Sequence, residues 1–165
     1  MNLRFLSLLA GVLLLAACAE NPPTTGGAAG GASATTPTTT TSNNSVQPGS
    51  KEDFVQNVGD RVFFDYDKSD IKAEGRQVLQ RQADWLKKYG NVTVTVEGHC
   101  DERGTREYNL ALGERRANAV KKMLVALGVA PNRVSTISYG KERPAVVGSN
   151  EAAWAQNRRG VTVIN

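Results

Sequence analysis

Alternating and helically spaced apolar residues predict a series of strands and helices between residue 61 and the end of the chain. Residues 92–99 alternate strictly, with valine at every second position from 92 to 96, which is typical of a strand with one buried face. Residues 73–89 carry apolar side chains at helical spacing, and a second such pattern, capped by Thr105, runs to about residue 127. Shorter apolar runs predict strands at 61–65, 134–138 and 161–164. Asn150, as a cap, predicts the start of a short helix at 151–156.

The predicted elements follow one another in the order strand, helix, strand, helix, strand, short helix, strand. Strands that alternate with helices favour helices layered on a sheet. We therefore expect an α+β domain over residues 51–165, with a mixed sheet of about four strands and the two long helices on one face. Periodicity alone does not predict the order of the strands in that sheet.

The first 17 residues have the pattern of a secretory signal peptide. One basic residue, Arg4, precedes the apolar run FLSLLAGVLLL at 5–15, and two alanines end the segment. The alternative is a membrane-spanning helix. However, at about 1.5 Å per residue this run spans only about 17 Å of a hydrocarbon core of about 30 Å. We therefore expect 1–17 to be a leader.

The residues that end the leader, Leu15-Ala16-Ala17-Cys18, resemble the lipobox of bacterial lipoproteins. The resemblance implies that Cys18 becomes the first mature residue and carries acyl chains such as palmitate, because two or more chains are needed for stable anchoring. Ala19 is not aspartate, which by the same resemblance implies an anchor in the outer membrane, with the domain facing the periplasm. The alternative is an ordinary buried cysteine.

Residues 18–50 are mostly threonine, glycine, alanine, serine and proline, with Val46 as the one large aliphatic residue. Such a segment cannot bury enough apolar surface to offset its loss of conformational entropy, so we expect a disordered tether. As a flexible coil it would span roughly 30 Å on average, and about 105 Å when fully extended. A tether that lets the domain search the space beneath the membrane and a passive spacer both fit this composition.

The stretch 97–117, EGHCDERGTREYNLALGERRA, concentrates the polar chemistry of the chain. Asp101 follows the predicted strand and Arg116 lies in the predicted helix, so a tight loop would bring an acid and a base to one surface pocket. An acid and a base at a fixed separation suit a small zwitterion that carries a carboxylate and an ammonium. The alternative is a surface ion pair, worth about 0–1 kcal/mol.

Other function classes find little support in the sequence. The net charge of +4 is interspersed, which argues against nucleic acid as a partner. His99 and Cys100 are neighbours on a strand and would point to opposite faces, so they would not form a catalytic dyad. Asp101 and Glu102 lack the two different environments that an acid–base pair needs, and one histidine with one cysteine makes no zinc site. We therefore expect neither an enzyme nor a bound metal.

Several separated motifs resemble one known family in their order along the chain. They are FDYDKSDI, VEGHCDERGTREYNLALGERRANAVK, SYGKERPAV and NEAAWAQNRR. Together they resemble the OmpA-like peptidoglycan-binding domain, and in particular the peptidoglycan-associated lipoproteins of the Tol–Pal system. The resemblance covers about residue 63 to the C-terminus, and the lipobox and the tether agree with it.

The resemblance implies binding to the diaminopimelate side chain of the peptidoglycan stem peptide, whose free end carries an ammonium and a carboxylate on one carbon. Matched by motif, Asp101 would accept from the ammonium, and Arg116 would pair with the carboxylate through its planar fork. Thr105, Asn109 and the backbone around Asp67 would line the same pocket. The resemblance implies no cofactor.

Protein partners are implied as well: the periplasmic propeller protein of the Tol system and other Tol components, in envelope integrity and cell division. The candidates for docking are Glu102, Arg103, Lys141 and Glu142, of which the first two otherwise fit a solvated charged rim. We hypothesise that the propeller protein and the cell wall compete. The alternatives are a lipoprotein that docks proteins without binding the wall, and a cell-wall hydrolase.

Cys100 departs from the family pattern, in which a small or hydroxylated residue is usual. With Cys18 acylated, Cys100 would have no disulfide partner within the chain. It shares the parity of Val94 and Val96 in the strand, which predicts a small buried side chain. An intermolecular disulfide is the alternative.

Overall fold

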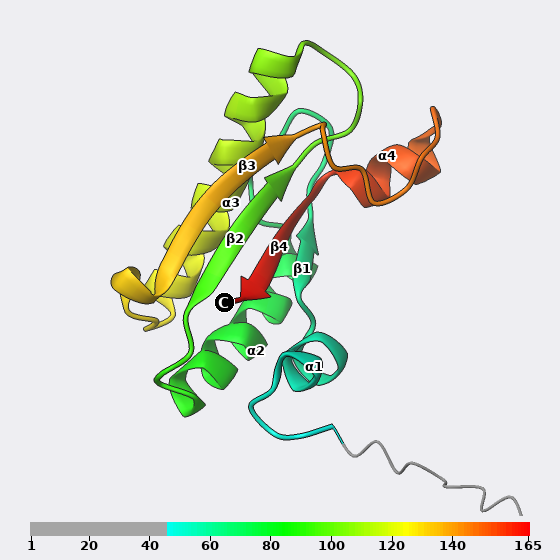
Figure 1. Cartoon of the computed structure of the whole chain (residues 1–165). Coiled ribbons are helices and arrows are strands. Elements are labelled where there is room, and N and C mark those ends of the chain that lie inside the picture. The colour runs from blue at the N-terminus through cyan, green and yellow to red at the C-terminus, as the bar shows by residue number, and fades with distance from the viewer. Residues whose placement is uncertain (1–45) are drawn as a thin grey trace, which may run out of the picture. The chain divides into compact units, whose positions relative to one another are not determined.

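Four strands and two long helices make up most of the part of the chain that the computed structural model describes, residues 46–165 (Figure 1). In chain order the elements are α1 (Lys51–Asp53), a π-helical turn η1 (Phe54–Val58), β1 (Arg61–Phe63), α2 (Ala73–Lys88), β2 (Val94–His99), α3 (Arg106–Ala126), a 3-10 turn η2 (Pro131–Arg133), β3 (Val134–Gly140), α4 (Glu151–Asn157) and β4 (Arg159–Ile164). Within this range no helix has both the length and the apolar character to cross a membrane. The predicted leader, the predicted acylation of Cys18 and the predicted tether up to residue 45 lie outside the described residues.

The strands form one mixed sheet in the order β1-β4-β2-β3. Strands β2 and β3 are parallel, whereas β4 lies between β1 and β2 and is antiparallel to both. Figure 1 shows α2 and α3 together behind one face of this sheet. The predicted fold class, with about four strands and two long helices on one face, is therefore confirmed.

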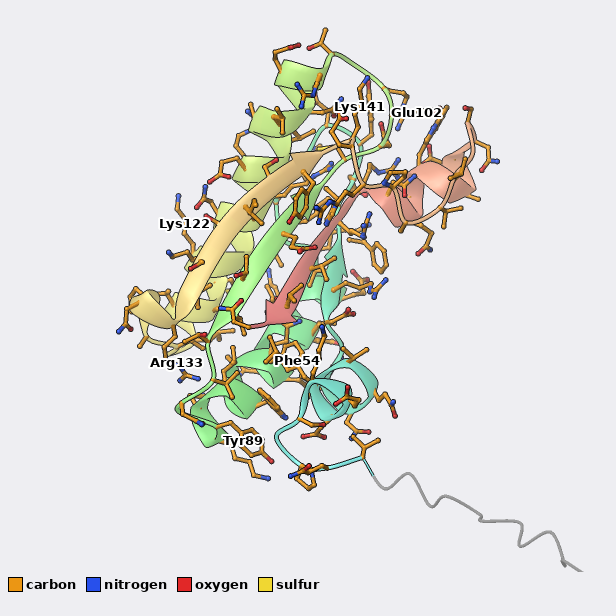
Figure 2. All side chains as sticks on the ribbon, in the orientation of Figure 1. Phe54, Tyr89, Glu102, Lys122, Arg133 and Lys141 are labelled. Carbon is orange, nitrogen blue, oxygen red and sulfur yellow. The ribbon has the colours of Figure 1, made fainter. Side chains whose placement is uncertain are left out.

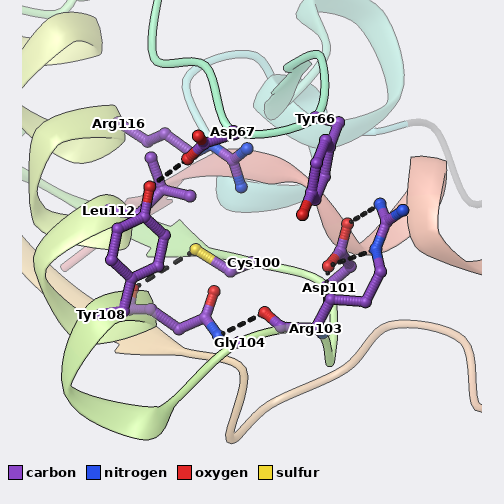
Figure 3. A pocket seen from close by; sticks show the side chains of 10 residues that line it. Tyr66, Asp67, Cys100, Asp101, Arg103, Gly104, Tyr108, Leu112 and Arg116 are labelled. Atoms are coloured by element: carbon purple, nitrogen blue, oxygen red, sulfur yellow. Dashed lines mark hydrogen bonds and ion pairs between the residues drawn. The ribbon is translucent and has the colours of Figure 1, made fainter.

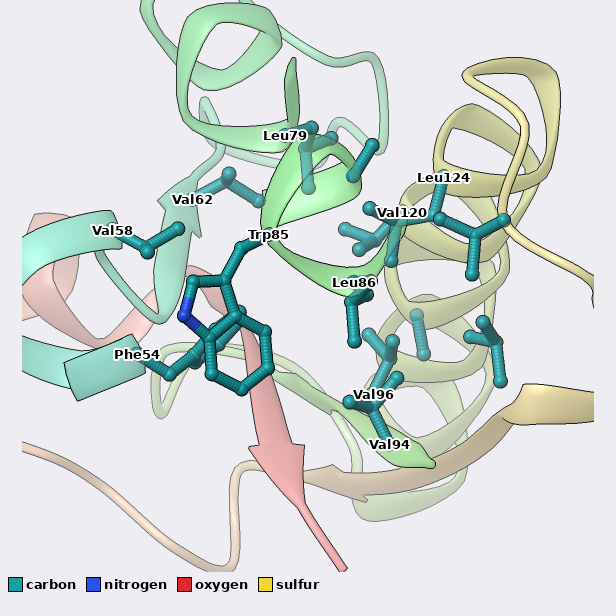
Figure 4. Packing of buried hydrophobic residues seen from close by; sticks show 14 of the residues in the cluster. Phe54, Val58, Val62, Leu79, Trp85, Leu86, Val94, Val96, Val120 and Leu124 are labelled. Carbon is teal, nitrogen blue, oxygen red and sulfur yellow. The ribbon is translucent and has the colours of Figure 1, made fainter. Parts of the chain in front are cut away.

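The hydrophobic core lies between that face and the two long helices (Figure 4). Each helix contributes the stripe that its sequence predicts, and the alternate valines of β2 face it, because the side chains of a strand point to opposite faces in turn. Fully or almost fully buried members are Leu79, Ala83 and Leu86 on α2, Val94 and Val96 on β2, and Ala117, Val120 and Leu124 on α3. Thr105 caps α3 by accepting from Tyr108 N at 3.2 Å, as predicted.

The predicted elements all occur, with shifts of a few residues at their ends. Strand β2 begins two residues later than predicted, and β3 continues two residues further, to Gly140. The first predicted strand is shorter, but its predicted faces are right: Val62 and Phe64 are buried and Phe63 is 39% exposed.

The elements α1 and η1, which pack on the end of α2, were not predicted from the sequence. The ring of Phe54 lies edge-on to that of Trp85, with centroids 5.0 Å apart, and Trp85 Nε1 donates to Asp53 at 2.8 Å. Gly49 N also donates to Asp53, at 2.8 Å, and Ser50 Oγ accepts from the backbone of Asp53. The folded part therefore includes Gly49 and Ser50, which the predicted boundary at residue 51 assigned to the tether.

A close contact between two glycines fixes α3 against the sheet. A Cβ atom at Gly98 of β2 would lie 1.8 Å from the carbonyl oxygen of Gly113 in α3, and one at Gly113 would lie 2.3 Å from Ser138 Oγ. The absence of side chains at these two positions lets the helix and the sheet approach closely. The contact places the first half of α3 directly beside the end of β2, where the candidate site lies.

Candidate functional site

A cavity of about 140 Å³ opens where β2 ends and α3 begins (Figure 3). It is lined by residues of three segments: Tyr66 and Asp67 after β1, Cys100, Asp101, Arg103 and Gly104 after β2, and Tyr108, Asn109, Leu112 and Arg116 of α3. Asp101 and Arg116, predicted to meet at one pocket, both line it. Thr105 is not among the lining residues, contrary to what the resemblance implied, because its side chain caps α3.

Arg116 is fully buried, and its guanidinium connects three segments. Nε donates to Lys68 O at 2.8 Å, Nη1 to His99 O at 2.8 Å and Nη2 to Asp65 O at 3.0 Å. These bonds use three of the five N–H donors of a guanidinium. Burial lowers the pKa of Arg116, and the nearby Asp101 carboxylate partly counteracts this. The cavity therefore has a fixed positive group in its wall.

Asp101 is also buried, at 4% exposure, but it does not pair with Arg116. Its Oδ1 accepts from the backbone N and from Nε of Arg103, both at 3.2 Å. Its Oδ2 accepts from Arg103 Nη2 at 2.6 Å and from Arg158 Nη1 at 3.4 Å. The alternative of a surface ion pair between Asp101 and Arg116 is therefore wrong: each is buried and holds its own partners around one cavity.

Burial alone would raise the pKa of Asp101, because it penalises the charged form. The hydrogen bonds and the charge of Arg103, together with the bond from Arg158, outweigh this effect and lower the pKa below its usual value. Asp101 is therefore ionised at neutral pH, and the cavity has one negative and one positive group.

Asn109 presents a defined face to the cavity. It is buried, and its amide nitrogen donates to the backbone oxygens of Arg103 and Thr105 at 2.8 and 3.0 Å. Both amide hydrogens are thereby used, which leaves Oδ1 as the acceptor for a donor in the cavity. Thr105 thus contributes a backbone oxygen that orients Asn109, although its side chain takes no part.

Asp67 lies at a turn that follows β1 and lines another part of the same cavity. Its φ of 55° is the one positive value among the non-glycine residues at 46–165, and it turns the chain over the cavity. The Asp67 carboxylate accepts from the hydroxyl of Tyr108 (Figure 3). The expected contribution of this turn to the pocket is therefore present, and the side chain of Asp67 takes part in it.

Arg103 is not the solvated rim residue that the charge pattern suggested. Its guanidinium carbon lies 4.0 Å from the ring centroids of both Tyr66 and Trp154, so the cation is held by two aromatic faces. In addition it pairs with Asp101. Local sequence order does not predict this arrangement, because the two rings come from distant segments.

The other residues considered for protein docking form a network beside the cavity. Glu102 accepts from Trp154 Nε1 at 3.0 Å, and Lys141 Nζ donates to two backbone oxygens of the loop after β2, at 3.2 and 2.7 Å. Glu142 pairs with Arg106 at 3.3 Å. Glu102 and Glu142 are exposed and Lys141 is half-buried. Lys141 ties the loop after β3 to the loop that carries Asp101, whereas Glu102 ties the latter loop to α4 and Glu142 ties the former to the start of α3.

The neighbours His99 and Cys100 point to opposite faces, as predicted. The His99 ring stacks on Tyr139 with centroids 5.5 Å apart, whereas Cys100 Sγ donates to Asn109 O of α3 at 3.3 Å. Burial raises the pKa of the Cys100 thiol to about 11 and, with the charge of Arg159, lowers that of His99 to about 4. Cys100 is 3% exposed, so the small buried residue is confirmed, and this burial does not support an intermolecular disulfide.

Among residues 46–165 no group of three or more histidine, cysteine, aspartate or glutamate side chains is placed to hold a metal ion. The cavity instead combines ionised groups of both signs, an oriented amide oxygen and the aromatic rings of Tyr66 and Tyr108, which are 58% and 45% exposed. Such a lining can bind a small ligand that carries both charges.

Comparison with known proteins identifies the family. The sequence model described as the OmpA family matches residues 63–158. The peptidoglycan-associated lipoprotein of Agrobacterium fabrum is 58% identical over 120 residues, which cover 73% of this chain and 68% of that protein. That of Brucella melitensis is 58% identical over 118 residues, covering 72% and 70%.

A solved structure agrees with these sequences. The crystal structure of the peptidoglycan-associated lipoprotein from Burkholderia pseudomallei matches with a TM-score of 0.66 and 38% identity, over 70% of this chain and all of that one. The family match, the identity to relatives and the shared fold all agree, and the chain therefore belongs to the OmpA family, among the peptidoglycan-associated lipoproteins.

Proposed function

We propose that this protein binds peptidoglycan non-covalently, by holding the zwitterionic end of a diaminopimelate side chain in the cavity between β2 and α3. The observation that carries the proposal is that Asp101 and Arg116 line one cavity of about 140 Å³ without neutralising each other. A carboxylate and an ammonium on one carbon match a fixed cation and a fixed anion on two sides of one cavity. The names of the relatives, which describe them as associated with peptidoglycan, support the cell wall as the binding partner.

In this proposal Arg116 donates its remaining N–H groups to the ligand carboxylate, and Asn109 Oδ1 with Asp101 accepts from the ammonium. A carboxylate has about four acceptor positions, and the bonds from Arg103 and Arg158 occupy that number at Asp101. The ammonium therefore has to replace one donor. We expect Arg103 to yield, because its side chain is 29% exposed whereas that of Arg158 is 7% exposed.

We further propose that an acylated Cys18 anchors the chain in the outer membrane and that residues 19–45 connect this anchor to the wall-binding domain. The protein would then link the outer membrane to the cell wall, as part of the Tol–Pal system in envelope integrity and cell division. Each charge-assisted hydrogen bond contributes roughly 1.5–3 kcal/mol, so a single site would bind with weak to moderate affinity. Many copies on one sacculus would add avidity.

A second function, docking of the Tol propeller protein, is favoured by the accessible network of Glu102, Lys141 and Glu142 at the rim of the cavity. A protein bound to this rim would cover the entrance to the site. We therefore expect the propeller protein and the wall to compete. Release of the chain from sacculi by added propeller protein is the expected result, and a ternary complex on sacculi would contradict it.

The test is co-sedimentation with purified sacculi, using the chain from Ala19 onward. We expect binding to diaminopimelate-type sacculi, loss of binding to lysine-type sacculi that lack the second carboxylate, and no release of soluble muropeptides. Asp101→Ala should weaken binding by about 2–5 kcal/mol, because it leaves opposing charges unpaired. Equal binding to both kinds of wall would exclude diaminopimelate as the feature recognised, and released muropeptides would favour the hydrolase instead.

A further inference from the structure

Arg158, at the end of α4, connects Asp101 to two other parts of the chain. It is 6% exposed. Its Nε donates to Phe64 O at 3.0 Å, Nη1 to Asp101 Oδ2 at 3.4 Å and Nη2 to Glu151 Oε1 at 2.6 Å. One guanidinium thereby joins the segment after β1, the loop after β2 and the first turn of α4. Nothing in the spacing of the sequence predicts that Arg158 reaches the site.

The two arginines on Asp101 differ in how firmly they are held. Arg103 lies on the same loop as Asp101, is partly exposed, and has Asp101 as its one ion-pair partner among the described residues. Arg158 comes from the opposite side, is buried, and has a backbone carbonyl and a second carboxylate as additional partners. A ligand that replaces Arg103 would therefore leave Arg158 in place.

We propose that Arg158 is a positioning residue for the ligand site, which fixes the Asp101 carboxylate toward the cavity and keeps it charged while a ligand ammonium replaces Arg103. The inference rests on the proposed binding of a zwitterion at this cavity. It assigns α4 a part in binding, although α4 does not line the cavity. Glu151 at the start of that helix holds Arg158, and Trp154 one turn later packs on Arg103.

Removal of Arg158 should change the titration of Asp101 in a defined direction. The groups that act on Asp101 include Arg103 and Glu102 on its own loop, Arg116 of α3, and Arg158 from the end of α4. The hydrogen bond from Arg158 helps to lower the pKa of Asp101, so loss of this bond raises that pKa. The site then loses its negative group at a higher pH as the solution is acidified. A purely structural residue that does not contact Asp101, such as one in β4, would not shift this titration.

The experiment uses the full chain in detergent micelles. Affinity for free meso-diaminopimelate is measured by calorimetry across pH, and the Asp101 carboxyl is titrated by carbon NMR without ligand. Arg158→Gln should bind roughly ten-fold more weakly or worse, since one charge-assisted bond is lost. The midpoint of its acid loss of binding and the Asp101 pKa should both move upward. For Arg158→Lys, both the affinity and the Asp101 pKa should lie between those of the wild type and of Arg158→Gln, because lysine can restore the charge but not all three bonds.

Two further variants keep the test decisive. Glu151→Gln changes a side chain that is 67% exposed, so this variant should fold. It should weaken binding as well, but by less than Arg158→Gln does. Arg159→Gln is the matched control: Arg159 is the adjacent buried arginine, but it donates to Asn157 O and Arg143 O and does not touch Asp101. Its affinity and its Asp101 pKa should match those of the wild type.

A folded Arg158→Gln chain with wild-type affinity and an unchanged Asp101 pKa would overturn the proposal. So would Arg159→Gln if it shifted both readouts as strongly as Arg158→Gln. If the wild-type chain does not bind meso-diaminopimelate, the proposed function fails, and the NMR titration alone then decides whether Arg158 holds Asp101.

Discussion

At the scale of single residues, Arg116 serves the fold and the site through the same group. Its guanidinium accounts for the backbone oxygens of Lys68, His99 and Asp65, which come from two segments that would otherwise present unpaired carbonyls around the cavity. Buried carbonyls without a partner are costly, so this arginine stabilises the wall of the cavity whether or not a ligand is present. Replacement by alanine would therefore impair folding and ligand binding together, and the two effects could not be separated.

Arg116→Lys separates these effects better, and adjacent Arg115→Lys is its control. A lysine keeps the charge but cannot reach three carbonyls and offer a fork to a carboxylate. We expect the free energy of unfolding to fall by about 3 kcal/mol or more, since each lost bond contributes about 1.5–3 kcal/mol. Sacculus binding should also be lost. Arg115 is exposed, so the free energy of unfolding of Arg115→Lys should stay within about 0.5 kcal/mol of that of the wild type. Equal effects of the two changes, measured by urea denaturation and co-sedimentation, would contradict this role.

His99 should make stability depend on pH. Its Nδ1 is buried with no hydrogen-bond partner in the described part of the chain, and burial lowers its pKa to about 4 from 6.5. Above pH 6.5 the ring is neutral in both states. As the pH falls from 6.5 to 4, the unfolded chain takes up a proton that the folded chain refuses, so stability declines by up to about 3 kcal/mol.

His99→Phe should remove this dependence while keeping the contact with Tyr139, which places the two rings 5.5 Å apart. We expect the variant to lose less stability than the wild type between pH 6.5 and pH 4, as measured by urea denaturation at each pH. Parallel pH profiles for the two chains would show that other groups cause the acid sensitivity.

The sequence predicted the central residues of the site but not their partners. Asp101 and Arg116 lie within one short stretch joined by a tight loop, so their meeting could be predicted from local order. Tyr66 and Trp154 come from segments on either side of that stretch and meet Arg103 only through tertiary packing. Arg158 was missed for the same reason. The local spacing of residues carries no information about which side chains from distant segments will contact a charged group.

At the scale of elements, the contact between β2 and α3 sets the shape of the cavity. The carbonyl oxygen of Gly113 occupies the space where a side chain at Gly98 would begin. With α3 this close to the strand, Nη1 of Arg116 lies 2.8 Å from His99 O. A wider spacing between the helix and the sheet would break that bond and open the cavity.

Gly98→Ala should therefore be strongly destabilising, and Gly90→Ala is the matched control. The added Cβ at Gly98 would lie 1.8 Å from a backbone oxygen, which cannot yield as a flexible side chain would. We expect a loss of more than about 3 kcal/mol or failure to fold. At Gly90 nothing lies within 4 Å of the added atom, so the change should be neutral or stabilising by less than about 1 kcal/mol. Thermal unfolding followed by circular dichroism measures both, and similar melting temperatures would contradict the role of the contact.

Long elements were predictable because each has many residues that repeat one pattern. The apolar stripes of α2 and α3 and the alternation in β2 gave their type, and Thr105 and Asn150 gave two helix starts as caps. The segment α1–η1 was not predictable, because so short a helix depends on tertiary contacts such as that of Phe54 with Trp85. The central place of β4 in the sheet was likewise open, since periodicity says which face of a strand is buried but not which strand lies next to it.

At the scale of the whole domain, the first described residues and the candidate ligand site lie at opposite ends of the sheet. Phe54 and Tyr89 mark the end where residue 46 joins the domain, and Glu102 and Lys141 mark the far end, beside the cavity (Figure 2). The strands of the sheet run between these two ends. In the proposed function, the anchor and the wall would therefore pull along the sheet, and a membrane attachment at the N-terminal side would not obstruct the cavity.

This arrangement predicts that the length of the segment before the domain matters in cells, whereas its sequence does not. Deletion of residues 24–41 would leave nine of the 27 residues at 19–45, with a reach of about 30 Å instead of about 90 Å. Affinity for soluble diaminopimelate should be unchanged, because the deletion leaves all the residues around the cavity in place. Crosslinking of the protein to sacculi in living cells should fall. A chain with the same residues 24–41 in shuffled order should crosslink like the wild type, since the reach of the predicted coil would depend on its length and composition. Loss of crosslinking in the shuffled chain would show instead that this segment contacts a partner through its own sequence.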